Sequence, residues 1–126
     1  MPRPIPDGTT HAVETEITPD MGVRHLGPSA AVLSTPSMIS LMERAALEAM
    51  RPHLEPGENS VGTKVCVSHL AAARVGDRVR TTAAFEAMNG RRSTWRVEVR
   101  KLDGTLIGEG THERAVIDQT RFATQG

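Results

Sequence analysis

The sequence has few aromatic side chains, one cysteine and no surplus of charge of either sign. Its 126 residues include one Trp, two Phe and no Tyr, and 15 basic residues balance 15 acidic ones. A nucleic-acid binder needs basic residues to neutralise phosphates, and a single-strand binder also needs stacking aromatics, so we expect no nucleic-acid partner. One cysteine cannot form an intrachain disulfide, and no Cys/His set has the spacing of a zinc site, so we expect no metal.

Long apolar runs are also missing. No stretch approaches the roughly 18 apolar residues that a membrane-spanning helix needs, and the opening segment 1–8, which holds three prolines, lacks the apolar core of a signal peptide. We therefore expect a cytoplasmic protein without a membrane partner. The length suits one domain over residues 1–126, with residues 1–8 and 119–126 loosely held.

The charge is distributed unevenly along the chain. Residues 74–101 carry eight basic and three acidic side chains, a net charge of +5, whereas residues 1–73 carry −3 and residues 102–126 carry −2. An arginine-rich segment of this kind is usually the solvated outer face of a sheet. The alternative is a site for an anionic ligand such as a nucleotide phosphate, which planar guanidinium groups recognise well.

One segment has the pattern of a long helix. Thr35 looks like its N-cap, Pro36 would take the first helical position, and helix formers continue to a predicted end near Arg51–Leu54. At about 100° per residue, the apolar side chains fill roughly half of the circumference. They are Met38, Ile39, Leu41, Met42, Ala45, Ala46, Ala49 and Met50. A stripe this wide predicts a helix half buried in a core.

Outside the helix the apolar period is two residues, which predicts strands. One strand is expected at His11–Ile17 and four follow the helix, at 60–70, 78–88, 91–101 and 105–117. Asn89-Gly90 is a strong signal for a two-residue hairpin in which both residues have positive φ. This order predicts an α+β protein with one antiparallel sheet of about five strands wrapped around one long helix, the layout of the hotdog fold. Its edge strand and open flank predict a homodimer, with a tetramer as the larger alternative.

Glu43 and His69 are the titratable residues most suited to catalysis. Glu43 lies at the edge of the apolar stripe, where a carboxylate is partly desolvated, a setting that suits a general base. Spacing alone favours the alternative, a boundary glutamate that reaches solvent or pairs with an arginine. His69 shares strand parity with Val61, Val65 and Val67 and therefore faces the helix. There it is either a hydrogen-bonded core histidine or a partner of Glu43.

Thr35 has a second role open to it besides capping, because a hydroxyl at a helix start lies near free N–H groups that stabilise a developing anion. Thr35 and Glu43 are eight residues apart, about 12 Å along the helix axis, so a shared site needs His69 between them or a second subunit. Gly62 and Thr63 interrupt the valine face of their strand. They mark either a β-bulge or a backbone N–H that binds an oxyanion.

The strands after the helix offer three further residues whose side chains could take part in chemistry. His112 and Arg114 share one face of the last strand, as an ordinary cross-strand pair or as a ligand contact. Cys66 has the parity opposite to that of His69, which argues against a Cys–His nucleophile pair.

Several segments taken together resemble one family, the fluoroacetyl-CoA thioesterase family of hotdog proteins, over about residues 20–117. The resemblance lies in VRHL at 23–26, TPSM at 35–38, LME at 41–43, PGE-x-SVGT at 56–63, VSH at 67–69 and GTHERAVI at 110–117. It implies an acyl-CoA thioesterase that acts as a homodimer. The implied catalytic set is Thr35, Glu43 and His69, with Gly62 and Thr63 near the thioester and Arg114 on the substrate side.

The resemblance also implies what the reaction needs. CoA enters as part of the substrate and no separate cofactor is expected. The segment before the helix, 27–34, is short and has no phenylalanine, whereas the family member that hydrolyses fluoroacetyl-CoA has a lid of phenylalanines there, so fluoroacetyl selectivity is not implied. The acyl group, and the choice between an acyl-Thr35 intermediate and direct attack by water, stay open. Alternative functions are a non-catalytic acyl-CoA-binding or sensing dimer and, without a visible motif, a hotdog hydratase.

Overall fold

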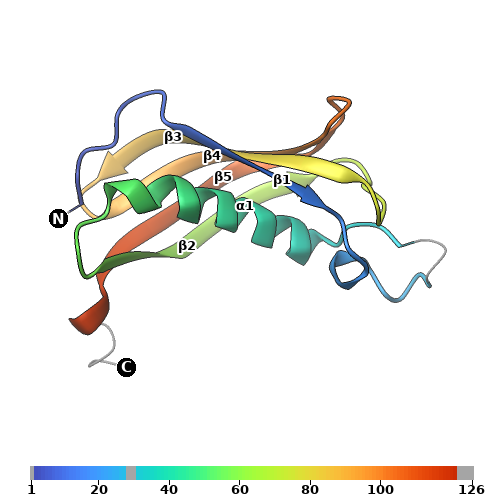
Figure 1. Cartoon of the computed structure of the whole chain (residues 1–126), viewed down its shortest axis with the longest axis horizontal. Helices are drawn as coiled ribbons and strands as arrows, with labels where there is room; N and C mark the ends of the chain where they lie inside the picture. The colour runs from blue at the N-terminus through green and yellow to red at the C-terminus, as the bar shows by residue number, and fades with distance from the viewer. Residues whose placement is uncertain (1, 28–30, 122–126) are drawn as a thin grey trace.

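The computed structural model describes residues 2–27 and 31–121 as one curved sheet that wraps around one long helix (Figure 1). In chain order the elements are β1 (Thr10–Glu16), the 3-10 turn η1 (Pro19–Met21), α1 (Thr35–Met50), the 3-10 turn η3 (Arg51–His53), β2 (Glu58–His69), β3 (Arg78–Asn89), β4 (Arg92–Lys101) and β5 (Leu106–Asp118). The predicted elements are all present, each with ends shifted by no more than a few residues.

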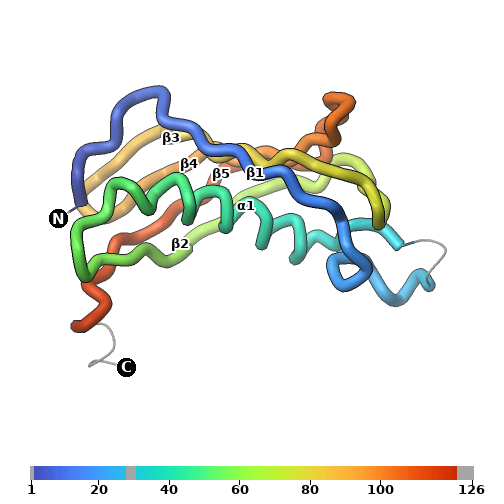
Figure 2. The backbone as a smooth tube through the Cα atoms, in the orientation of Figure 1, coloured from blue at the N-terminus to red at the C-terminus, as the bar shows by residue number. Residues whose placement is uncertain are grey.

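The five strands pair antiparallel in the order β1-β3-β4-β5-β2. The short connections between β3, β4 and β5 make these strands neighbours, while β1 and β2 lie at the two edges of the sheet. The backbone trace shows α1 crossing the concave face, with β1 on one side of it and β2 on the other (Figure 2). The predicted α+β layout is therefore confirmed, and β2 keeps one edge without a strand partner among the described residues.

The β3–β4 hairpin forms, but one residue later than predicted. Asn89 pairs with Arg92, so the two turn residues are Gly90 and Arg91 rather than Asn89 and Gly90. Gly90 has φ +63°, and no non-glycine residue of the described chain has a positive φ. The prediction that Asn89 adopts positive φ is wrong, because the glycine alone supplies the left-handed position and Asn89 stays in the strand.

The cap of α1 also differs from the prediction. Ser34, not Thr35, is the N-cap, since its side-chain oxygen accepts a hydrogen bond from the Ser37 N–H at 3.2 Å. Thr35 is thus the first residue of the helix, and its hydroxyl is not used for capping. The predicted end is close to the observed one, because α1 stops at Met50 and η3 continues as a single tighter turn.

The core lies between α1 and the concave face of the sheet. Seven of the eight predicted stripe residues of α1 are buried, and Ile39 is half-buried. They pack against inward-facing residues of the central strands, chiefly Val79, Ala83, Trp95, Val97, Val99 and Ile107. Trp95 is the largest fully buried side chain and meets Phe85 edge to face, with ring centroids 5.5 Å apart. Its indole N–H donates to Ser93 Oγ at 2.9 Å, so its polar end is satisfied.

The N-terminal segment lies beside the end of the helix. Ile5 is buried, and the Arg3 N–H donates to the His53 carbonyl oxygen at 2.9 Å. The expected looseness of residues 1–8 and 119–126 stays a prediction, and residues 1 and 122–126 lie outside the described part of the chain. Within that part, no helix is both long and apolar enough to cross a membrane.

Candidate active site

Thr35 and His69 meet at the start of α1. The Thr35 Oγ1 atom lies 2.9 Å from His69 Nδ1, the side chain of the last residue of β2. Where Nδ1 carries no proton, the threonine hydroxyl donates to it, as a nucleophile donates to its general base. The predicted proximity of His69 to the helix is therefore present. It depends on Ser34, which takes the cap and leaves the Thr35 hydroxyl free to reach the histidine.

A glycine brings the start of the helix close to the sheet. His69 pairs with Gly108 of β5, and a Cβ built on Gly108 would overlap the Met38 sulfur atom and lie 2.8 Å from the Ser68 carbonyl oxygen. A larger residue at this position would force the Met38 side chain of α1 to move. The lack of a side chain at Gly108 thus leaves room for Met38, in the first turn of α1, to pack against β5 beside His69.

A shallow surface pocket of mixed polarity opens beside this pair, with a volume of about 360 Å³. Thr35 and His69 are its polar members. The other lining residues come from the segment before α1 and the segment after β2, and they are Val23, Val32, Leu33, Leu70, Ala71 and Ala72. A hydroxyl paired with an imidazole in the wall of a pocket can attack a carbonyl whose substituent lies in that pocket.

Glu43 lies in a second cluster, farther along α1. Its carboxylate packs against Gly62 of β2, where a built Cβ would lie 2.5 Å from Glu43 Oε2, 3.0 Å from His112 Cε1 and 3.5 Å from Arg114 Nη1. Three functional side chains thus converge on the one position of β2 that has no side chain. Glu43 is half-buried, and no ion pair joins it to Arg114 in the described structure.

Arg114 and His112 are held in defined orientations within this cluster. Arg114 is 5% exposed and donates from Nε to Ser60 Oγ and from Nη2 to the Ser60 carbonyl oxygen, both at 2.9 Å. His112 is 1% exposed, and its Nδ1 lies 2.9 Å from the Lys64 carbonyl oxygen. Burial lowers the pKa of His112 from its ordinary value, and the charge of Arg114 lowers it further, although the hydrogen bond to Lys64 opposes both. Burial also lowers the pKa of Arg114, while the charge of Glu43 acts against that change.

The interruption of β2 at Gly62 is a β-bulge. Gly62 pairs with Arg114 and Lys64 with Glu113, so Thr63 is the extra residue. The bulge reverses the strand parity, which puts Ser60 and Gly62 on the helix side before it and Val67 and His69 on that side after it. The prediction that Val61 shares a face with His69 is therefore wrong. Thr63 Oγ1 donates to the Glu113 carbonyl oxygen at 3.2 Å and is otherwise exposed.

The three predicted catalytic residues do not form one cluster within the chain. Thr35 contacts His69, and Glu43 packs on Gly62, but no hydrogen bond or ion pair in the described residues joins the two groups. Gly62 and His69 are separated along β2 by seven residues, a span of roughly 20 Å. In this structure His69 therefore does not bridge Thr35 and Glu43 of the same chain.

The start of α1 offers one free backbone donor. Pro36 has no N–H, the Ser37 N–H bonds to Ser34 Oγ, and the Met38 N–H bonds to the Ser34 carbonyl oxygen at 2.9 Å. The Thr35 N–H has no partner in the described residues. It is therefore the single donor at this helix end that could bind an oxyanion.

Other predicted features lie away from both clusters. Cys66 is exposed on the convex face of β2, and the described residues hold no group of three or more His, Cys, Asp or Glu side chains suited to a metal. The strand arginines of the basic segment lie on the convex face, where Arg96 pairs with Glu109 and Arg100 with Glu98. This arrangement fits a solvated outer face, and contact with CoA phosphates stays a prediction.

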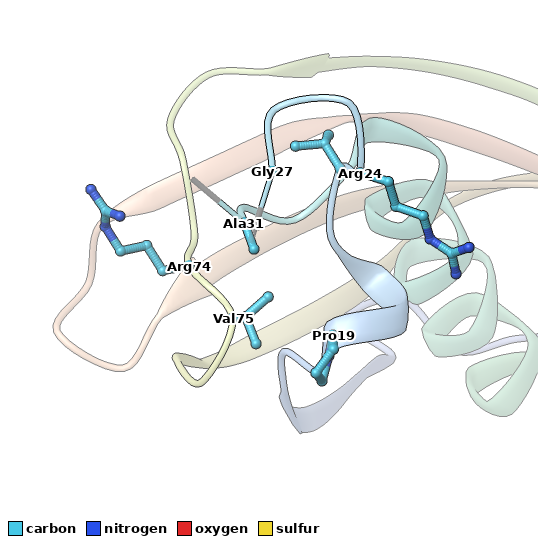
Figure 3. A pocket seen from close by; sticks show the side chains of 7 residues that line it. Pro19, Arg24, Gly27, Ala31, Arg74 and Val75 are labelled. Atoms are coloured by element: carbon cyan, nitrogen blue, oxygen red, sulfur yellow. The ribbon is translucent and has the colours of Figure 1, made fainter. Parts of the chain in front are cut away.

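A larger hollow of about 560 Å³ lies between the segment before α1 and the loop that holds Arg74 and Val75. Figure 3 shows Pro19, Ala31 and Val75 around it, while the Arg24 and Arg74 side chains extend outward on opposite sides. Val23 lines this hollow as well as the pocket beside Thr35. The predicted absence of a phenylalanine lid concerns the same segment, of which residues 28–30 lie outside the described part.

Comparison with known proteins identifies the relatives of this fold and site. The family model for fluoroacetyl-CoA-specific thioesterase matches residues 17–120. The chain belongs to this family. The fluoroacetyl-CoA thioesterase of Streptantibioticus cattleyicolor is 46% identical, in a match that covers 84% of this chain and 81% of that protein. Every residue of both clusters, from Thr35 to Arg114, lies within the segment that the family model matches.

Solved structures agree with this family and with the fold. A structure of the fluoroacetyl-CoA thioesterase superposes with a TM-score of 0.87 at 40% identity, covering 97% of this chain and 95% of that one. A thioesterase superfamily member from Thermus thermophilus gives a TM-score of 0.91 at 39% identity, with 98% and 91% covered. A hot-dog-like protein from Thermanaerovibrio acidaminovorans, 24% identical with a TM-score of 0.85 over 95% and 89% of the chains, supports the fold alone.

Proposed function

We propose that this protein hydrolyses a short acyl-CoA thioester to the free acid and CoA in a site completed by two subunits. Membership of the thioesterase family makes the chain a thioester hydrolase that acts on acyl-CoA. The observation that carries the finer proposal is the 2.9 Å contact between Thr35 Oγ1 and His69 Nδ1 in the wall of a surface pocket. A nucleophile and its base are paired there where an acyl group has room to lie.

The size of the pocket supports a short acyl group. Its volume of about 360 Å³ is at the low end of ligand pockets, and Val32, Leu33 and Leu70 are among the residues that line it. No aromatic residue lines it in the described structure. Without an aromatic lid, contacts that would single out a fluorinated acetyl group are fewer, so we expect acetyl- and propionyl-CoA to be hydrolysed at rates comparable with fluoroacetyl-CoA.

A homodimer would bring the separated parts of the site together. β2 has a free edge, and antiparallel pairing of two β2 strands about a two-fold axis near Val65 and Cys66 would place His69 opposite the partner's Gly62. The Thr35–His69 pair of one chain would then face the Glu43 carboxylate of the other. This pairing also covers a strand edge that would otherwise be open to aggregation.

The residues of such a composite site have complementary roles. Glu43 acts as the general base or orients the attacking group, and His69 accepts the proton of Thr35 or of a water molecule. The Thr35 N–H and backbone N–H groups of the Gly62 bulge are the donors available to the oxyanion, and Thr63 and Arg114 border the substrate. The thiolate leaves with little need for a proton, and hydrolysis requires no redox step, so we propose that the enzyme uses no cofactor besides the CoA of its substrate.

Hydrolysis of an acyl-CoA panel with thiol detection tests this function. The panel should include acetyl-, fluoroacetyl-, propionyl-, phenylacetyl- and palmitoyl-CoA. We expect turnover of the short substrates, a loss of kcat of about 10³-fold in Glu43→Gln and His69→Ala, and a loss of a similar order in Thr35→Ala if the threonine is acylated.

The controls test the roles of the residues separately from the reaction itself. His11→Gln removes a histidine whose Nε2 contacts Glu48 on the other flank of α1, and it should keep the full rate. No turnover of any panel member by the wild-type protein would contradict the thioesterase reading. Full rates in Glu43→Gln and His69→Ala would contradict the residue roles while leaving the reaction intact.

A further inference from the structure

His112 is fully buried beside Glu43, yet it has no role in the reaction proposed above. Its two ring nitrogens contact two groups with opposite hydrogen-bonding properties. Nδ1 lies 2.9 Å from the Lys64 carbonyl oxygen, which can only accept a hydrogen bond, so Nδ1 must carry the proton. Nε2 lies 3.1 Å from Arg114 Nη1, which can only donate, so Nε2 must be unprotonated. Only the neutral Nδ1–H tautomer satisfies both contacts.

The contact with His112 Nε2 gives the Arg114 guanidinium its third hydrogen bond. Ser60 holds Nε and Nη2 from one side, and His112 Nε2 holds Nη1 from the other. All three nitrogens are thus bound by protein groups, and Arg114 has no rotational freedom within the cluster. A charged imidazole would lose the acceptor at Nε2 and would set a second positive charge against the guanidinium.

The fixed guanidinium faces the carboxylate of Glu43 across Gly62. Glu43 Oε2 and Arg114 Nη1 lie 2.5 and 3.5 Å from the same built Cβ position, and the two charges attract each other without a direct ion pair. This attraction favours the rotamer that lays the carboxylate against Gly62. If the guanidinium turned away, Glu43 would lose that attraction and could swing toward solvent.

The same network spans the β-bulge. Ser60 precedes the bulge and Lys64 follows it, and both are tied to β5 through Arg114 and His112. The bulge sets where Gly62 lies under Glu43. One pair of buried side chains therefore fixes both the surface on which the carboxylate rests and the cation that attracts it.

We propose that His112 is a positioning residue for the thioesterase reaction, whose Nε2 lone pair orients Arg114 so that the guanidinium keeps the Glu43 carboxylate against Gly62. This inference rests on the proposed function, in which Glu43 is the reacting carboxylate. His112 touches neither substrate nor nucleophile in this arrangement, and its effect on the rate passes through Arg114 and Glu43.

Two substitutions distinguish this role from simple packing. His112→Met keeps the volume but removes the acceptor, whereas His112→Gln supplies an amide oxygen that can accept from Arg114. With acetyl-CoA as substrate we expect His112→Met to lower kcat by about tenfold or more with KM within about threefold of wild type. We expect His112→Gln to recover kcat to within about threefold of wild type, since it restores the acceptor. Equal losses in the two variants, at equal thermal midpoints, would overturn the proposal.

A double-mutant cycle tests whether the effect passes through Glu43. In a Glu43→Gln background, His112→Met should cause no further loss of kcat, because residues that act as a unit are not additive. A further loss of kcat in this background would show that His112 does not act through Glu43 and would contradict the inference. If Glu43→Gln alone keeps the full rate, the proposed role of Glu43 fails by itself.

Nitrogen NMR of the histidine rings in the wild-type protein keeps the inference testable even if His112→Met does not fold. The ring of His112 should appear as the neutral Nδ1–H tautomer and should keep that form across the pH range of activity. An Nε2–H tautomer or an imidazolium at neutral pH would be incompatible with acceptance from Arg114. Such a result would disprove the proposal whatever the fate of the proposed function.

Discussion

Among single residues, Gly62 is the one whose lack of a side chain matters most to the arrangement of the site. Its missing side chain leaves the volume in which the Glu43 carboxylate, the His112 ring and the Arg114 guanidinium converge. Any Cβ there would lie 2.5 Å from Glu43 Oε2, which is closer than real contacts allow. The glutamate end is flexible, so the fold can absorb the change, but the carboxylate would have to move.

Gly62→Ala should therefore damage activity more than stability. We expect kcat/KM for acetyl-CoA to fall by about 10²-fold, the usual result of displacing a reacting group by about 1 Å, while the thermal midpoint changes by only a few degrees. Steady-state kinetics and thermal unfolding on the same preparations would measure both. Ser68→Ala, an exposed position of the same strand, is the matched control and should match wild type in both measurements.

The sequence indicated some of the important residues but not all of their partners. The contact of His69 with the helix followed from strand parity past Val65, and Thr35 followed from its place at a helix start. The cap did not, because Ser34 and Thr35 are both good capping residues and the choice depends on tertiary contacts. Strand parity placed Arg114 beside His112, but the neutral state of His112 also depends on the Lys64 carbonyl of β2, which follows the bulge, and no local pattern shows that contact.

At the scale of elements, the start of α1 affects both the stability of the helix and the position of the Thr35 hydroxyl. Ser34 closes the helix with its side chain, and its backbone N–H also donates to the Met21 carbonyl oxygen at 2.8 Å. The next residue is Thr35, so any fraying of the first turn would move the hydroxyl away from His69. The cap therefore holds the nucleophile as well as the helix.

Replacing the cap should reveal this link. Ser34→Ala should lower the free energy of unfolding by about 1 kcal/mol, the typical cost of a lost N-cap, and should lower kcat by several-fold as the first turn loosens. Ser34→Asp supplies an equivalent acceptor and should restore both values. Urea unfolding followed by far-ultraviolet circular dichroism, together with thiol-release kinetics, would test this. An unchanged kcat in a destabilised Ser34→Ala protein would show that the cap and the hydroxyl are independent.

Elements were easier to predict than their register. The period-two pattern located all five strands, because buried and exposed side chains alternate wherever the ladder is regular. It failed at Gly62–Lys64, where the bulge adds one residue and reverses the faces. It also placed the β3–β4 turn one residue early, because the register of a hairpin depends on the pairing of the whole ladder. Both errors come from contacts between strands, which are absent from a single strand's sequence.

For the whole molecule, the buried cluster predicts a dependence of stability on pH. The pKa of His112 is lowered by burial from its ordinary value of 6.5. Between 6.5 and that lowered value, the unfolded chain binds a proton at this ring and the native chain does not. The free energy of unfolding should therefore fall as the pH falls below 6.5, with a slope from this group of at most about 1.4 kcal/mol per pH unit.

Urea unfolding at pH values of about 7.5, 6.5 and 5.5 would measure this effect. His112→Gln has no ionisable ring at this position, so its stability should change less with pH over the same range. Carboxylates such as Glu48, whose pKa is lowered mainly by its hydrogen bond with His11, should affect stability only at more acidic pH, below their ordinary value of 4.5. Parallel pH profiles for wild type and His112→Gln would contradict the prediction.

The separation of the two clusters along β2 predicts that two inactive variants can complement each other. Since Thr35 and His69 lie at the end of this strand and Glu43 rests on Gly62, near its middle, each site of the proposed dimer takes its parts from both chains. A heterodimer of one Thr35→Ala chain and one Glu43→Gln chain would then contain one site with both substitutions and one site with neither. Two inactive variants, unfolded together and refolded as a mixture, should regain about a quarter of the wild-type rate through their heterodimers. A mixture as inactive as its components would show that each chain works with its own residues alone.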